Sequence, residues 1–269
     1  MARPIVLKLG GELLEDAART QAVAGEIARA AAAWPVVVVH GGGREIDAAL
    51  SRAGIPKRQV DGIRVTDQPT LDIVVSVLAG AVNTRFVAAI NASGGRAVGL
   101  TGADSGVAPV EPMPPFRSAA GETVSMGLVG LPVQDGVPHL LSHLIGGGYV
   151  PVVATLGAGA DGALYNVNAD TLAAALAVRL QASRLLIAGT TPGVLDGEGR
   201  TIAELDARTE QELAAAGTVN RGMLAKLQAC RAALAGGVAD VSIVDGRDAA
   251  RLRDALAAKD NASSKTRVV

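Results

Sequence analysis

Two lysines far apart in the chain, each near glycines, are the residues whose type and setting best suit chemistry. Lys8 ends a short apolar run and precedes Gly10 and Gly11, and Lys226 lies shortly after Gly222 in a segment of helical composition. Phosphoryl transfer depends mainly on charge neutralisation and positioning, which ammonium groups and backbone amides at glycine turns supply. A lysine that extends out of a sheet edge, or a solvated helix lysine, is the structural alternative for each.

A second glycine turn has the sequence His40-Gly41-Gly42-Gly43, and it follows a run of four valines. A strand, a glycine turn and a helix start form an anion site, because free backbone amides and the helix dipole point the same way. The spacing lacks G-x-G-x-x-G and the turn does not follow the first strand, so a dinucleotide-binding fold fits poorly. A tight turn alone also accounts for the glycines, and His40 is expected to pack in the turn rather than to act as a base.

Polar residues elsewhere could bind a carboxylate or orient the lysines. Arg64 stands in a loop before a long helical pattern and suits bidentate binding of a carboxylate, although a surface pair with Asp61 or Asp67 is the simpler interpretation of this segment alone. Asn166, Asn168 and Asp170 alternate, so an extended segment would present them on one side. Asp170 stands at a helix start, where it serves either as an N-cap or as the group that orients the lysines, and the residues favour the two readings equally.

Composition excludes several classes of function. The formal net charge of −1 gives no overall attraction to nucleic acid or anionic membrane, and an aromatic content of 2% argues against base-stacking surfaces. Cys230 is the only cysteine, so an internal disulfide and a cysteine-based zinc site are excluded. Neither a Ser-His-Asp set nor a metal-ligand spacing is present. No apolar stretch is expected to approach the roughly 18 residues of a membrane span, and we expect a cytoplasmic protein.

Strand and helix patterns alternate along the chain of 269 residues, which predicts a three-layer α/β/α sandwich with a central, mostly parallel sheet. Strands are predicted at 4–9, 35–39, 96–100, 149–155, 184–188 and 239–244. Helices are predicted at 16–33, 43–53, 68–92, 138–146, 169–182, 207–216, 222–236 and 247–258. The Gly- and Pro-rich segment 101–136 is expected to form protruding hairpins, and the polar stretch 259–265 to be loose.

In order along the chain, these motifs resemble those of the amino acid kinase superfamily, and within it those of the acetylglutamate kinases. The resemblance is carried by 8–11, 40–43, 62–66, 166–170, 192–196, 222–226 and 245–247. It implies the amino acid kinase fold in a single domain, 1–269, with one lobe (about 1–165) for the acyl acceptor and one (about 166–269) for the nucleotide. The implied reaction moves the γ-phosphoryl group of ATP, with Mg²⁺, to the side-chain carboxylate of N-acetyl-L-glutamate, as in arginine biosynthesis. That carboxylate is ionised at neutral pH, so the reaction needs no general base.

The resemblance also assigns roles to residues. Lys8 and Lys226 would stabilise the transferring phosphoryl group, and Asp170 would hold both lysines in place. Residues implied to bind the substrate are Gly42, Gly43, Arg64, Asn166 and Asn168. Residues implied to bind the nucleotide are Gly10, Gly11, Gly189, Thr190, Gly193, Leu195, Gly222 and Met223. No side chain is assigned to the metal, and Thr190 departs from the family, which usually carries an aspartate there.

Assembly and substrate are the remaining expectations. The chain starts almost at its first strand, whereas arginine-inhibited relatives carry an extra N-terminal helix, so a homodimer insensitive to arginine is expected. The broad apolar stripe of 68–92 favours a dimer, although burial within the monomer is the alternative. Other candidate functions are a sister kinase acting on another carboxylate, such as carrier-linked aminoadipate, a carbamate kinase, and a non-catalytic binding protein of the same fold.

Overall fold

The central strands are continuous apolar runs because both of their faces are covered. In the computed structural model, which describes residues 2–258 and 265–269, Ile5, Leu7 and Leu9 of β1 (Ile5–Leu9) belong to the hydrophobic cluster on one face. Val6 belongs to the cluster on the opposite face. Side chains alternate across a strand, so Lys8 shares the face of Val6.

The strands form one main sheet. Among the described residues its order is β14-β16-β15-β13-β1-β2-β10-β5, parallel throughout except for the antiparallel pair of β15 and β16. The strands besides β1 are β2 (Val36–His40), β5 (Ala97–Thr101), β10 (Val150–Ala154), β13 (Arg184–Gly189), β14 (Glu204–Leu205), β15 (Asp240–Asp245) and β16 (Lys265–Val268).

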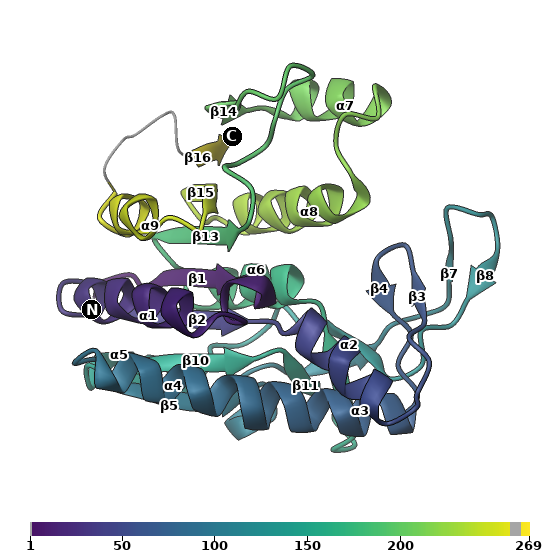
Figure 1. Ribbon diagram of the computed structural model, residues 1–269, viewed down its shortest axis with the longest axis horizontal. Coiled ribbons are helices and arrows are strands. Elements are labelled where there is room, and N and C mark those ends of the chain that lie inside the picture. Colours follow the sequence, from purple (N-terminus) through teal and green to yellow (C-terminus); the bar gives the residue numbers. More distant parts are fainter. Residues whose placement is uncertain (1, 259–264) are drawn as a thin grey trace.

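Helices cover both faces of this sheet, so the predicted three-layer α/β/α sandwich is confirmed (Figure 1). The face of Leu7 is covered by α1 (Ala17–Ala31), α2 (Gly43–Arg52), α9 (Ala249–Leu256) and the continuous run of α3 (Gln68–Val75), η2 (Ser76–Val82) and α4 (Asn83–Ala92). The face of Lys8 is covered by α5 (His139–Gly146), α6 (Ala169–Arg179) and α8 (Arg221–Ala235). Helix α7 (Ala207–Ala215) lies near β14, at the edge of the molecule (Figure 1).

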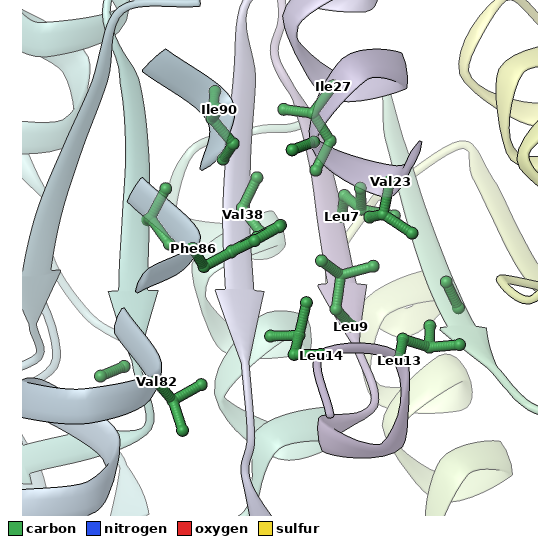
Figure 2. Close-up of a cluster of buried hydrophobic side chains, with 14 of the residues drawn as sticks. Leu7, Leu9, Leu13, Leu14, Val23, Ile27, Val38, Val82, Phe86 and Ile90 are labelled. Atoms are coloured by element: carbon green, nitrogen blue, oxygen red, sulfur yellow. The ribbon is translucent and has the colours of Figure 1, made fainter. Parts of the chain in front are cut away.

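The core between β1, β2 and the first group of helices holds the long apolar side chains (Figure 2). Leu7 and Leu9 contact the α1 side, where Val23 and Ile27 are fully buried, and Phe86 of α4 packs in the same cluster. Each such burial contributes about 1.5–3 kcal/mol relative to an exposed side chain. The cluster fixes the strand ends from which the glycine turns begin.

Hairpins and a small second sheet stand at one end of the main sheet. The expected hairpins in 101–136 are present, because β6 (Val110–Pro112) pairs with β9 (Val129–Pro132) and β7 (Phe116–Arg117) pairs with β8 (Thr123–Val124). The unpredicted strands β11 (Leu156–Ala158) and β12 (Leu164–Val167) extend the β6–β9 sheet. A further hairpin of β3 (Gln59–Val60) and β4 (Ile63–Arg64) protrudes beside β7–β8 (Figure 1), and the Ala119 amide donates to Asp61 at 2.9 Å.

The expectation that no apolar stretch approaches the length of a membrane span is wrong. The segment Gln68–Ala92, 25 residues with a mean hydropathy of 1.9, is long and apolar enough to cross a membrane by length and composition. Its apolar pattern has a use inside the protein, since Leu71, Val74, Leu78 and Phe86 pack in the core (Figure 2 shows Phe86).

Most predicted elements match those observed to within a few residues at their ends. The exceptions are short strands such as β14 and β16, which the pattern of apolar runs did not reveal. The stretch 259–265 that was expected to be loose lies outside the described residues, apart from Lys265, which begins β16.

Candidate active site

A carboxylate and two ammonium groups meet at the carboxyl end of β1. Nζ of Lys8 lies 2.9 Å from one carboxylate oxygen of Asp170, and Nζ of Lys226 lies 3.3 Å from the other. The Lys8 and Asp170 side chains are 6% and 7% exposed, and that of Lys226 is 22% exposed. The three groups therefore carry one net positive charge in a largely dry setting.

Local sequence explains why these side chains converge. Lys8 is on the sheet face that α6 and α8 cover, and these two helices pack against each other. Asn168 caps α6 by accepting from the amides of Asp170 and Thr171 at 2.9 and 3.0 Å. Since Asn168 is the N-cap, the alternative reading of Asp170 as the cap does not hold, and its carboxylate is free to face the lysines. Asn220 caps α8 in the same manner, six residues before Lys226.

The electrostatics of Asp170 follow from this arrangement. Burial disfavours the charged carboxylate, but Lys8 and then Lys226 outweigh it and hold the pKa of Asp170 below its ordinary value. Asp170 is therefore an anion at neutral pH and orients both ammonium groups.

The two glycine turns touch beside this centre. A β-carbon on Gly11 would lie 2.7 Å from Cα of Gly42 and 3.0 Å from the amide nitrogen of Gly43, closer than real side chains allow. Gly42 is the N-cap of α2, and Gly10 precedes the 3-10 turn η1 (Gly11–Leu13). The free amides of two helical turns thus start next to each other, which makes the turns suited to bind anionic oxygens.

A small cavity of about 180 Å³ opens beside the second glycine turn, and Arg64 and Asn166 line it. Arg64 is only 8% exposed, and its Nη1 is buried with no hydrogen-bond partner among the described residues. Asn166 donates to Thr66 at 3.2 Å. An unpaired buried guanidinium nitrogen is costly unless a ligand binds it, so this cavity is suited to a small carboxylate.

Sequence reasoning missed Asp47, which fixes Arg64. Asp47 forms an ion pair with Arg64 and a second one with Lys57 at 2.7 Å. Burial disfavours its charge, but Lys57 and Arg64 keep the pKa of Asp47 below its ordinary value. Its position on α2, one turn after the glycines, was the available signal.

Asn83, which contacts His40, is a second residue of the site that the sequence did not reveal. Burial lowers the pKa of His40 to about 4, so the ring is neutral. Nδ1 of His40 then donates to the Gly41 carbonyl at 3.2 Å, and Nε2 accepts from Asn83 at 3.0 Å. Asn83 also donates to the Val152 carbonyl at 2.9 Å, which ties the turn to β10. The expectation that His40 packs in the turn agrees with this geometry, whereas nothing in the sequence marked Asn83.

Apart from Gly10 and Gly11 of the first glycine turn, the residues expected to bind the nucleotide fall into two groups. Gly189 ends β13 close to Lys226, Thr190 follows it half-buried, and Gly222 and Met223 form the first turn of α8. Gly193 instead faces β16: its φ is +137°, and a β-carbon there would lie 2.4 Å from Oγ1 of Thr266. Leu195 forms a bridge with Thr201. The structure therefore gives Gly193 a packing role that the sequence did not reveal.

Comparison with known proteins identifies similarity to the amino acid kinase family and to acetylglutamate kinases. The sequence profile of the amino acid kinase family matches residues 3–245. The acetylglutamate kinase of Dinoroseobacter shibae is 39% identical over 90% of this chain and 82% of its own length. That of Sorangium cellulosum is 42% identical, over 90% of this chain and 86% of its own.

Solved structures agree on the fold. An N-acetylglutamate synthase from Neisseria gonorrhoeae, complexed with coenzyme A and L-arginine, superposes with a TM-score of 0.84 at 23% identity, over 99% of this chain and 61% of its own. A carbamate kinase from Giardia lamblia bound to AMP-PNP gives a TM-score of 0.69 at 16% identity, over 100% of this chain and 98% of its own.

Proposed function

The chain belongs to the amino acid kinase family, and we propose that it is an enzyme that transfers the γ-phosphoryl group of ATP to the side-chain carboxylate of N-acetyl-L-glutamate, a step of arginine biosynthesis. Identity near 40% over nine tenths of the chain supports the reaction and its acceptor. The observation that carries the proposal is the pairing of Lys8 and Lys226 with one buried carboxylate beside two touching glycine turns.

The mechanism follows from charge. The acceptor carboxylate is already ionised at neutral pH, so the obstacle is repulsion between two anions rather than removal of a proton. Lys8 and Lys226 would neutralise the phosphoryl oxygens, and Asp170 would keep the ammonium groups in place. Amides at Gly11, Gly42 and Gly43 would bind oxygens whose charge grows in the transition state.

The acceptor would occupy the cavity beside α2. Arg64, with its unpaired Nη1, would bind the α-carboxylate of N-acetylglutamate, and Asn166 would contact the same end of the molecule. Asn168 lines this cavity too and caps α6, so it links the acceptor to the helix that carries Asp170. The amides of the second glycine turn would face the reacting end. Most of the cavity lining belongs to 1–165, so we keep that segment as the acceptor lobe, to which Asn166 and Asn168 are added from the start of the other lobe.

The nucleotide would lie over the 166–269 lobe, where Gly189, Thr190, Gly222 and Met223 surround the approach to Lys226. Mg²⁺ fits this site, because the Glu12 carboxylate lies over Gly10 and no described residue binds it, and because Mg²⁺ prefers oxygen ligands from phosphates and carboxylates. When bound, Mg²⁺ supplies further neutralisation of phosphate charge.

Acyl phosphate formation tests the proposal. The protein is incubated with ATP, Mg²⁺ and one acid at a time, and the product is trapped as a hydroxamate. N-acetylglutamate is compared with glutamate, aspartate, aminoadipate and carbamate. A clear preference for N-acetylglutamate is expected. Activity on another acid instead would show that the enzyme has a different acceptor substrate. No activity on any acid would favour the non-catalytic alternative.

Assembly and location are further parts of the proposal. The homodimer was predicted from the apolar stripe of 68–92. Leu71, Val74 and Leu78 of that stripe are buried within one chain, whereas Ile73 and Val75 are half-buried. Light scattering on the purified protein gives the mass directly, and a monomer would exclude the dimer.

Similarity to bacterial biosynthetic kinases supports a cytoplasmic location.

A further inference from the structure

Glu12 holds its carboxylate back over the first glycine turn. It stands in η1, directly after β1. A β-carbon on Gly10 would lie 2.5 Å from Oε1 and 2.7 Å from Oε2 of Glu12. The carboxylate thus occupies the space that a side chain at Gly10 would fill, beside the amides that begin the turn.

The same carboxylate reaches the end of the neighbouring strand. β1 and β13 pair in parallel, Leu9 opposite Ala188, so Gly10 and Gly189 leave the sheet side by side. The Gly10 amide donates to the Ala188 carbonyl at 2.9 Å. A β-carbon on Gly189 would lie 3.9 Å from Oε1 of Glu12 and 4.0 Å from Cε of Lys226. Glu12 and Lys226 therefore border the same small space at the strand ends.

Glu12 differs from Asp170 and Asp47 because no described side chain forms an ion pair with its carboxylate. Asp170 is paired with two lysines, and Asp47 is paired with Arg64 and Lys57. Within residues 2–258 and 265–269, no donor binds the Glu12 carboxylate, and Arg19 binds only its main-chain oxygen, at 3.2 Å. A bare carboxylate at a phosphate site repels the ligand unless a cation lies between them.

We propose that Glu12 supplies a carboxylate oxygen to the Mg²⁺ ion that binds with the nucleotide phosphates. The inference rests on the proposed function, because it needs a nucleotide at Lys226. Mg²⁺ takes one or two carboxylates, with phosphate oxygens and waters at its remaining positions, so a single protein ligand is sufficient. Lys226 would then bind the phosphates directly, and Glu12 would bind them through the cation.

Manganese binding to the protein with AMP-PNP tests this ligand. Mn²⁺ replaces Mg²⁺, and the free ion is counted by its electron paramagnetic resonance signal. The protein, Glu12→Gln and Glu15→Gln are titrated with saturating AMP-PNP. Glu15 is the matched control, since it is an acid three residues along that pairs with Arg44. Glu12→Gln should weaken Mn²⁺ binding about 10-fold or more, the range seen when a group supporting a metal site is lost, and Glu15→Gln should leave it unchanged.

Binding of AMP-PNP without metal separates a ligand from a structural residue. Loss of the negative charge in Glu12→Gln should leave metal-free binding equal or tighter, because repulsion of the phosphates is removed. A parallel loss of metal-free and metal-dependent binding would mean that Glu12 only supports the turn, and equal Mn²⁺ affinity in all three proteins would also overturn the inference.

The titration distinguishes failure of the proposed metal ligand from failure of the proposed function. The acceptor acid is absent from the titration, so a wrong acceptor would not change it. A wild-type protein that binds no AMP-PNP would overturn both the kinase and the metal ligand. Wild-type binding of AMP-PNP with no effect of Glu12→Gln would overturn the metal ligand alone.

Discussion

The carboxylate of Asp170 lies 2.9 Å from the ammonium nitrogen of Lys8, and both side chains are more than nine tenths buried. A buried ion pair of this kind contributes little to stability, because desolvation offsets much of the attraction. Its value is positional, since it holds an ammonium group at the end of β1 where phosphoryl oxygens would lie. The other carboxylate oxygen of Asp170 pairs with Lys226, so this one side chain orients an ammonium group from the strand and another from helix α8.

Replacement of Asp170 tests this positional role. Asp170→Asn keeps the shape but leaves the two lysines to repel each other, so kcat should fall about 100-fold, within the range for lost electrostatic support in a transition state. Steady-state kinetics with both substrates saturating measure the effect. Asp72→Asn, an exposed acid on α3, is the control. A kcat for Asp170→Asn equal to that of the control would show that the lysines need no orienting group.

Arg64 and Asp47 predict a graded effect on the acceptor. Arg64→Ala should raise KM for N-acetylglutamate about 10- to 100-fold and leave KM for ATP unchanged, because a charge-assisted hydrogen bond contributes about 1.5–3 kcal/mol. Asp47→Asn should raise the same KM less, since Arg64 keeps its charge but loses its anchor. Lys57→Ala, which removes only the second cation on Asp47, should change neither value. Equal increases in both KM values for Arg64→Ala would make this arginine structural.

His40 predicts a pH dependence of stability. Its pKa is about 4 in the native state and near 6.5 when unfolded, so between these values only the unfolded chain takes up the proton. The free energy of unfolding should therefore fall as the pH is lowered through this window, by about 1.5 kcal/mol between pH 6.5 and 5 from this residue alone. Urea unfolding of wild type and His40→Gln at both pH values measures it. The variant should lose that much less, and identical losses would contradict the prediction.

Two glycines with opposite surroundings predict opposite effects. Gly11→Ala should lower stability by about 1–3 kcal/mol and reduce kcat, because its β-carbon would strike the backbone of Gly42. Gly25 lies within α1 with nothing within 4 Å of a β-carbon, so Gly25→Ala should stabilise by about 0.5–1 kcal/mol. Thermal unfolding of both variants is the measurement. A stable, fully active Gly11→Ala would mean that the two turns can separate.

The fold was largely predictable because its strands are buried on both faces. Val36–Val39 and 185–188 are apolar without interruption, and such runs have few interpretations in a chain that alternates with helical segments. Short edge elements such as β14 and β16 were not predictable, because their pairing depends on partners distant in sequence. Gly193 is predicted to contact the nucleotide, and its close packing against Thr266, which the sequence does not reveal, exists only through that edge pairing.

The site was predictable where a residue type is rare in its setting. Lys8 interrupts a buried strand, and Asp170 opens a buried helix, so both stood out in the sequence. Asn83 and Asp47 are ordinary residues on amphipathic helices, and only the tertiary structure shows that they anchor His40 and Arg64. Residues that act by holding others in place leave little trace in a single sequence.

The rate of phosphoryl transfer in a single turnover of Lys8→Ala tests the central claim most directly. Enzyme in excess over ATP is mixed with saturating N-acetylglutamate and Mg²⁺, and acyl phosphate is followed by rapid quench. The rate in Lys8→Ala should be about 100- to 1,000-fold below that of wild type, as expected for loss of a charge that acts in the transition state. A near-wild-type rate in Lys8→Ala would contradict the assignment of this lysine, and with it the proposed catalytic centre.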